Sequence, residues 1–158
     1  MNWIRTAWFR WFDRELDRIV KLPSRDSIET GEWNRLVGET GERLAGKQIH
    51  RRGGKVLFRN FRAPKGGEVD IVYRDEETLV FAEVKTRTSD QFGRPGDAVD
   101  REKERLIIRG ANAWLRELNL PSVLFRFDVI EVFLLPGKQV EVKINKDAFT
   151  TPQRGLGE

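Results

Sequence analysis

Residues 68–85 read EVDIVYRDEETLVFAEVK, and this stretch decides the fold. Two runs rich in valine and other β-forming residues, at positions 69–73 and 79–84, flank the acidic group Asp75-Glu76-Glu77. Apolar runs on either side of a short polar turn are typical of an antiparallel β-hairpin. We therefore expect a tight hairpin with charged side chains at the ends of its two strands.

The register of this hairpin determines which side chains meet. Side chains alternate along a strand, so Glu83 and Lys85 share one face and Val84 points to the other. A turn that is symmetric about the two central glutamates places Asp70 opposite Glu83 and Glu68 opposite Lys85. Directly opposed residues have Cβ atoms about 5 Å apart, so the first pair can share one cation. Without a cation, two such carboxylates would repel each other.

Asp70, Glu83 and Lys85 are the types of residue that phosphodiester hydrolysis requires. A Mg²⁺ or Mn²⁺ ion held by the carboxylates lowers the pKa of its bound water and acts as a Lewis acid. A lysine beside the ion can orient or deprotonate that water, or hold phosphate oxygens. The alternative is a solvated face with a surface salt bridge that contributes little. Spacing, register and the flanking apolar runs agree, and together they favour the metal site.

The composition restricts the metal and the partner. The chain of 158 residues suits one domain, or one domain with an arm, and its net charge of +4 fits a polyanionic partner such as DNA. It contains no cysteine and one histidine, His50, which we place at the surface or a helix end. A metal must then be held by oxygen ligands, which suits Mg²⁺ or Mn²⁺. Neither a membrane-spanning run nor a signal peptide is evident, and we expect a cytoplasmic protein.

The pattern on either side of the hairpin predicts the remaining elements. Glycine and proline mark the turns between them. The order helix, three strands, helix, two strands indicates an α/β fold with a mixed β-sheet flanked by helices. The expected elements are a helix over 32–52 that Gly53-Gly54 ends, a strand that starts at 56–58, the hairpin, a helix over 97–118, and strands over 123–135 and 140–144.

Residues 2–21 predict an extra N-terminal amphipathic helix with an unusual number of aromatic side chains. We divide the chain into this helix with its linker at 1–30, a nuclease-like domain at 31–149 and a tail at 150–158. The aromatic stripe needs a partner surface. Its own domain, the arm of a homodimer partner, another protein and a membrane surface are the alternatives. We expect protein contact, away from the metal site.

Two more charged residues lie on helical faces that point toward the sheet. Glu42 shares a face with Gly38, Ala45 and Ile49, which directs its carboxylate inward, although a solvent-facing glutamate is the alternative. The direction of the Lys103 side chain, on the helix predicted at 97–118, is open in the same way. This side chain either extends outward to solvent or reaches the scissile phosphate. The face that we expect to carry it consists of Val99, Lys103, Leu106, Gly110, Ala113 and Trp114.

Several motifs occur in a fixed order along the chain. They are Gly38-x-x-Gly41-Glu42-x-x-Ala45, Asn60-Phe61-Arg62, Gly67-Glu68-Val69-Asp70, Phe81-x-Glu83-Val84-Lys85-Thr86-Arg87, Val99-Asp100-x-x-Lys103 and Phe127-Asp128-Val129. Over about residues 36–135 this set resembles the YraN family of bacterial proteins. That family is grouped with the PD-(D/E)xK nucleases and is similar to archaeal Holliday junction resolvases. The resemblance implies a restriction-endonuclease-like core and an endonuclease activity.

The resemblance also implies roles for individual residues. Asp70, Glu83 and Lys85 match the nuclease signature, with Val69 where the superfamily name has proline. Glu42 matches the helix-borne acid of the resolvases and would assist the metal, directly or through water. Asp70 and Glu83 would bind the metal, and Lys85 would position the attacking water. The residues expected to contact phosphates are Arg62, Arg87 and Lys103.

These observations predict a Mg²⁺- or Mn²⁺-dependent hydrolase that cleaves DNA. A preference for branched or structured DNA follows from the likeness to resolvases alone. One alternative is a nucleic-acid-binding or assembly module that keeps the nuclease fold but has little activity. Another is an adaptor that acts through the aromatic helix. Activity against DNA, and the effect of deleting residues 1–30, distinguish the three.

Overall fold

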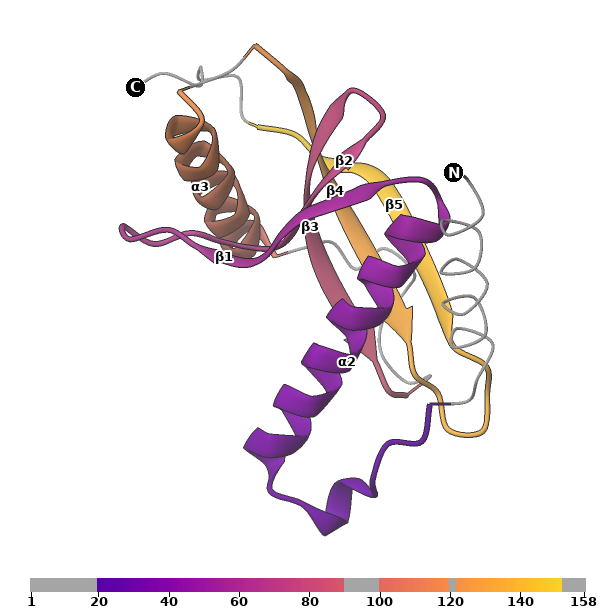
Figure 1. Cartoon of the computed structure of the whole chain (residues 1–158). Helices are drawn as coiled ribbons and strands as arrows, with labels where there is room; N and C mark the ends of the chain where they lie inside the picture. The colour runs from indigo at the N-terminus through magenta and orange to yellow at the C-terminus, as the bar shows by residue number, and fades with distance from the viewer. Residues whose placement is uncertain (1–19, 90–99, 120–121, 152–158) are drawn as a thin grey trace.

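The computed structural model describes residues 20–89, 100–119 and 122–151. The expected order of helix, three strands, helix and two strands is confirmed (Figure 1). The aromatic helix predicted at 2–21 and the tail predicted at 150–158 lie almost entirely outside the described residues. The elements are the short 3-10 helix η1 (Arg25–Ser27), α2 (Thr30–Arg51), β1 (Lys55–Arg62), β2 (Glu68–Asp75), β3 (Thr78–Arg87), α3 (Arg101–Glu117), β4 (Leu124–Phe133) and β5 (Glu141–Phe149).

The five strands form one mixed sheet in the order β1-β2-β3-β4-β5. All neighbours are antiparallel except β3 and β4, which run parallel. A parallel pair cannot be joined by a tight turn, and the connection between these two strands contains α3. The predicted hairpin register is confirmed, because Ile71 pairs with Ala82 and Val72 pairs with Phe81.

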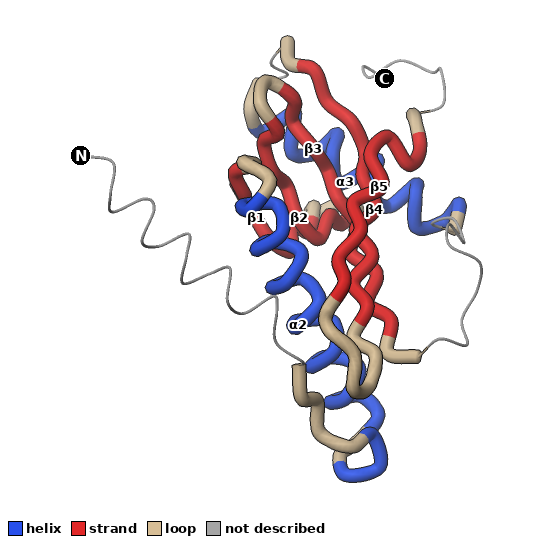
Figure 2. Tube along the Cα trace, turned by 90° about the vertical axis from the view of Figure 1, so that its right-hand side faces the viewer, coloured by secondary structure: helices blue, strands red, loops and turns tan. Residues whose placement is uncertain are grey.

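Strand β3 is central because it is apolar on both faces. Phe81 packs in a cluster with residues of α3, whereas Val80 and Ala82 pack in a cluster with residues of α2. The two helices therefore cover opposite faces of the sheet (Figure 2). A strand that is covered on both sides loses the polar alternation of a half-exposed strand. Each charged side chain at the end of β3 therefore lies either on the α2 face or on the α3 face of the sheet.

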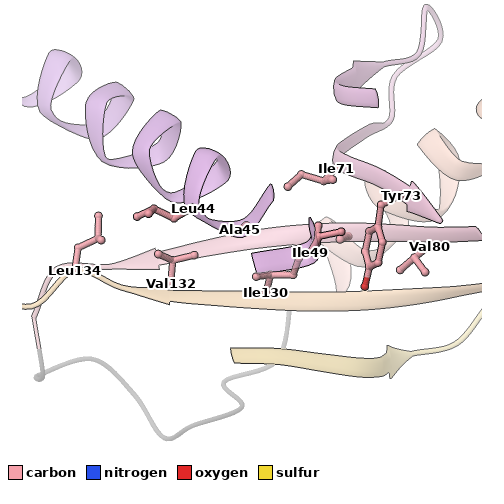
Figure 3. Packing of buried hydrophobic residues seen from close by; sticks show 10 residues of the cluster. Leu44, Ala45, Ile49, Ile71, Tyr73, Val80, Ile130, Val132 and Leu134 are labelled. Atoms are coloured by element: carbon pink, nitrogen blue, oxygen red, sulfur yellow. The ribbon is translucent and has the colours of Figure 1, made fainter. Parts of the chain in front are cut away.

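Helix α2 contributes Leu44, Ala45 and Ile49 to the first cluster, where they pack against Ile130 and other strand residues (Figure 3). Helix α2 ends at Arg51, directly before the region of Gly53-Gly54 that was predicted to end it. Gly53 has a φ of +87°, which a residue without a side chain adopts at little cost. The following amide donates a hydrogen bond to the carbonyl of Ile49 at 3.0 Å.

Helix α3 is rotated slightly from the predicted face. Gly110 is buried, and Ala113 and Trp114 pack half-buried against the cluster as expected, but Leu106 is half-buried and is not part of it. The fully buried apolar positions are Ile107, Ala111 and Leu115, and Val99 lies outside the described residues. A Cβ on Gly110 would lie 3.0 Å from the Glu68 amide nitrogen, so this position must face the start of β2.

The glycines of α2 provide a matched test of packing between α2 and β3. A Cβ on Gly41 would lie 1.8 Å from Oγ1 of Thr86, whereas a Cβ on Gly38 has nothing within 4 Å. We expect Gly38→Ala to increase the free energy of unfolding by about 0.5–1 kcal/mol, because alanine favours helix. Gly41→Ala is expected to decrease it by about 1–3 kcal/mol through overpacking. Urea unfolding of both variants measures the difference, and equal effects would show that α2 does not approach β3 this closely.

Among the described residues, no helix combines the length and apolar character that a membrane crossing requires.

Candidate active site

The charged ends of β2 and β3 meet at the end of the hairpin that is remote from its turn. The strand ladder stops at the pair Ile71 and Ala82. Beyond it, the carboxylate of Asp70 accepts a hydrogen bond from the backbone amide of Val84 at 2.8 Å. The side chain therefore replaces a ladder bond. This contact holds one Asp70 oxygen against β3 beside Glu83.

Glu83 is the most buried acid of this region, with 7% of its surface exposed. It continues the alternation of Phe81 and lies on the α3 face of the sheet. Burial, followed by the negative charge of Asp70, raises the pKa of Glu83 to about 8. Within the described structure its Oε2 atom has no hydrogen-bond partner. A buried acceptor without a donor is a strong site for a cation.

Lys103 approaches this acid from α3. Asp100 caps the helix by accepting a hydrogen bond from the Glu102 amide at 3.0 Å, which fixes the first turn. The Lys103 ammonium binds the Glu68 carboxylate and lies 3.4 Å from Oε2 of Glu83. Burial opposes the charged form of Lys103, but the surrounding carboxylates outweigh it and raise its pKa. The hydrogen bond from Lys103 lowers the pKa of Glu68.

Glu42 reaches the same region from α2, on the other face of the sheet. Its carboxylate accepts a hydrogen bond from Nδ2 of Asn60 at 2.8 Å, and Arg59 bonds its backbone carbonyl at 2.9 Å. Asn60 has a φ of +53°, an irregularity in β1 that asparagine tolerates better than most residues. Burial raises the pKa of Glu42, the Asn60 hydrogen bond opposes this, and the charge of Asp70 adds to it.

Asp70 thus lies between an acid on each face of the sheet. Its charge acts on both Glu42 and Glu83, but in the described part of the chain no three acidic or histidine side chains converge on one point. The donor set still fits Mg²⁺ or Mn²⁺, because all its atoms are oxygens and Oε2 of Glu83 has no hydrogen-bond partner among the described residues, only the Lys103 ammonium at 3.4 Å. The residues that could hold such an ion are Asp70 and Glu83, with Glu42 coupled to Asp70 through its charge.

The remaining predicted site residues lie in different environments. Lys85 is half-buried on the same face as Glu83, and its amine has no ion-pair or hydrogen-bond partner in the part of the chain that the structure describes. Arg62 is exposed near Glu68, and its charge contributes to the low pKa of that carboxyl group. The Arg87 guanidinium bonds Glu131 at 3.1 and 3.2 Å, and 18% of its side chain is exposed. We expected Arg87 to contact a phosphate, but in this structure its guanidinium binds the Glu131 carboxylate instead.

The sequence did not identify Glu68 as a site residue. We expected Glu68 opposite Lys85, but its carboxylate binds Lys103 and its backbone pairs with Arg62. The reason is that the ladder with β3 ends before this point, and the first turn of α3 lies closer. The sequence did contain a signal for Glu68. This residue stands two positions before Asp70, at the start of the same apolar strand.

The raised pKa of Glu83 predicts how stability depends on pH. Between its ordinary pKa of 4.5 and the raised value of about 8, the folded protein binds a proton that the unfolded chain releases. Stability should then fall as pH rises through this window. We expect the melting temperature of metal-free protein to decrease from pH 5 to pH 8, and Glu83→Gln to flatten the decrease. The exposed Glu77→Gln is the control, and the same slope in both variants would contradict the assignment.

The fold and the site define the class of protein. It is an α/β protein with a mixed five-stranded sheet between two helices, and with carboxylates gathered at the ends of two adjacent strands. Residues 41–132 match the family described as Uncharacterised protein family UPF0102, and the chain belongs to this family. The predicted YraN resemblance is confirmed at this level. The matched segment contains every residue of the acidic region described above.

Individual relatives agree with this assignment. A UPF0102 protein of Caldanaerobacter subterraneus is 40% identical over 111 residues, which cover 70% of this chain and 90% of the relative. A UPF0102 protein of Geobacter sulfurreducens is 41% identical over 121 residues, or 77% of this chain and 94% of the relative. One from Beutenbergia cavernae is 48% identical over 96 residues, or 61% and 80%. The family match places the shared part at residues 41–132, which include β1 to β3, α3 and most of β4.

Proposed function

We propose that this protein is a Mg²⁺- or Mn²⁺-dependent endonuclease that hydrolyses phosphodiester bonds in DNA, on a restriction-endonuclease-like core. The observation that carries the proposal is the closeness of Asp70 to the buried Glu83, whose Oε2 atom has no hydrogen-bond partner among the described residues and only the Lys103 ammonium at 3.4 Å. Burying such an acid is unfavourable unless a cation or another donor compensates it. An unpaired lysine on the same strand face, Lys85, adds the third component of a hydrolytic site.

Each residue has a role that follows from its position. Asp70 and Glu83 would hold the metal, and Glu42, whose carboxyl group feels the charge of Asp70, would assist directly or through water. When bound, the ion supplies Lewis acidity and lowers the pKa of coordinated water. Lys85 would orient the attacking water and take up or share its proton. Its amine is available for this role because no described carboxylate binds it.

The substrate would lie over the α3 side of the hairpin end. Arg62 is exposed beside Glu68 and is placed for a phosphate contact. Arg87 and Lys103 were expected to act in the same way, but both bind carboxylates in the absence of DNA. Branched or structured DNA is the proposed substrate class because of the likeness to resolvases, and the proposed location is the cytoplasm, where DNA is present.

A nicking assay on supercoiled plasmid tests this function. The full chain is incubated with Mg²⁺, with Mn²⁺ or with EDTA, and relaxed and linear products are separated on a gel. We expect metal-dependent conversion to the relaxed form, and faster cleavage of a synthetic four-way junction than of its linear arms. Metal-independent cleavage, or none with either ion, would contradict the proposal.

One observation favours a second function. The Lys103 ammonium already lies 3.4 Å from Glu83, so the protein can neutralise its buried acid without a metal. A DNA-binding or assembly module of low activity would use the site in this state. Binding of a junction with no cleavage at any metal concentration is the result that would support it.

A further inference from the structure

A lysine lies inside the acidic region where the metal would bind. Its ammonium contacts Glu68 and is 3.4 Å from Oε2 of Glu83, and 27% of its side chain is exposed. The position is fixed by the backbone. A Cβ on Gly67 would lie 2.6 Å from the Gly110 nitrogen, so α3 is pressed against the start of β2. Lys103 therefore cannot move away by a shift of the whole helix.

The two carboxylates that hold Lys103 differ in character. Glu68 makes a hydrogen bond with it and has 35% of its side chain exposed, while Glu83 has 10%. The contact with Glu83, at 3.4 Å, is longer than an ordinary hydrogen bond, whereas the contact with Glu68 is a close hydrogen bond. The ammonium can consequently leave Glu83 more easily than Glu68 and remain bound to Glu68.

Lys103 also occupies an unfavourable place in its own helix. It is the third residue of α3, and the amino-terminal end of a helix carries a partial positive charge. Its neighbours in the first turn, Glu102 and Glu104, are acidic as this end prefers. A lysine there is stabilised only by the carboxylates of the sheet. Its placement therefore depends on the acidic region rather than on helix formation.

We propose that Lys103 is a built-in counter-ion that competes with the divalent metal for Glu83 and moves fully onto Glu68 when the metal binds. The inference rests on the proposed metal site. In the metal-free protein the lysine limits repulsion between Asp70 and Glu83, and it weakens metal affinity because its positive charge would repel a divalent ion bound to the same carboxylate. After metal binding, Glu68 holds the ammonium beside the site, where it can contact a phosphate oxygen.

Titration of the full-length protein with Mn²⁺ alone, followed by the electron paramagnetic resonance signal of the free ion, tests this. We expect Lys103→Gln to lower the Kd for Mn²⁺ by about tenfold, because a positive charge close to the ion has been removed. Lys55→Gln removes the same charge from an exposed position on β1 and should leave the Kd unchanged. Circular dichroism checks that each variant is folded.

A double-mutant cycle tests the role of Glu68. If Glu68 acts by holding Lys103, Glu68→Gln should raise the Kd in the wild-type background and change it much less in Lys103→Gln. Equal effects in both backgrounds, or a Kd in Lys103→Gln that is unchanged or higher, would overturn the inference. If wild type then binds Mn²⁺ and Asp70→Asn does not, the proposed function still stands. Absence of Mn²⁺ binding in both wild type and Lys103→Gln would overturn both proposals.

Discussion

Replacing Asp70 by asparagine is expected to reduce metal-dependent nicking by about 1000-fold, which corresponds to ~4 kcal/mol of transition-state stabilisation. The amide is isosteric with the carboxylate, and its oxygen can still accept the hydrogen bond from the Val84 amide. The local backbone should then be retained. What is lost is a negative ligand between Glu42 and Glu83, the two acids on which the charge of Asp70 acts.

Although Asp70→Asn should lose activity, it should not lose stability. Removing one charge from an acidic region relieves repulsion, so Asp70→Asn should fold at least as stably as wild type without metal. Mg²⁺ or Mn²⁺ should raise the melting temperature of wild type but not of the variant, because the ligand stabilises only a folded state that binds it. Asp26→Asn, in the exposed η1, is the matched control. Equal nicking, or equal metal stabilisation, in wild type and Asp70→Asn would place the ion elsewhere.

The second large effect is expected at Asp128, on the face of the sheet opposite to Glu83. This carboxylate is fully buried and accepts a hydrogen bond from the Tyr73 hydroxyl at 2.6 Å and two from Arg126, at 2.9 and 3.1 Å. The guanidinium also bonds Asp75 at 2.7 Å, and Lys146 reaches the same oxygen at 2.7 Å. Burial, followed by the bond to Asp128, raises the pKa of Tyr73. The network joins β2, β4 and β5.

Asp128→Ala should lower the free energy of unfolding by about 3 kcal/mol, because the Tyr73 hydroxyl loses its acceptor and the partly buried Arg126 guanidinium keeps Asp75 but loses two of its hydrogen bonds. The melting temperature should fall by about 10 °C for a chain of this size. Tyr73→Phe, which removes one donor, should decrease stability by only about 1 kcal/mol. Differential scanning calorimetry measures both, with Asp26→Ala as the exposed control. A loss below that of Tyr73→Phe would show that the network contributes little.

The sequence predicted the fold well wherever local patterns decide it. The hairpin register followed from the symmetric spacing about Glu76 and Glu77, and the end of α2 followed from Gly53 and Gly54. The face of α3 was predicted less well. Gly110 lies on the expected side, but the other buried positions, Ile107, Ala111 and Leu115, are set by packing against strand residues that are distant in the chain. Periodicity alone does not contain this information.

The candidate site was predictable only in part, for a similar reason. The register predicted that Asp70 faces Glu83, and the ladder follows this register only as far as Ile71 and Ala82, after which Asp70 bonds the Val84 amide. The partners of charged side chains from other elements could not be inferred. Arg87 binds Glu131 because β3 and β4 are parallel neighbours in this sheet, and Lys103 binds Glu68 because α3 crosses the start of β2. Such pairs follow from the packing of distant segments.

The parallel pairing of β3 with β4 also has a consequence for the order of events during synthesis. The acids at positions 42, 70 and 83 precede α3 in the chain, and β4 can pair with β3 only after the connection through α3 is complete. Contacts between distant segments form late because closing a long loop is entropically unfavourable. A nascent chain that has emerged only to about residue 100 therefore carries its carboxylates without Lys103. At the proposed metal site, a divalent ion would then meet no competition from Lys103. The ammonium is added only with α3, and an ion bound before that point would have to remain bound in its presence.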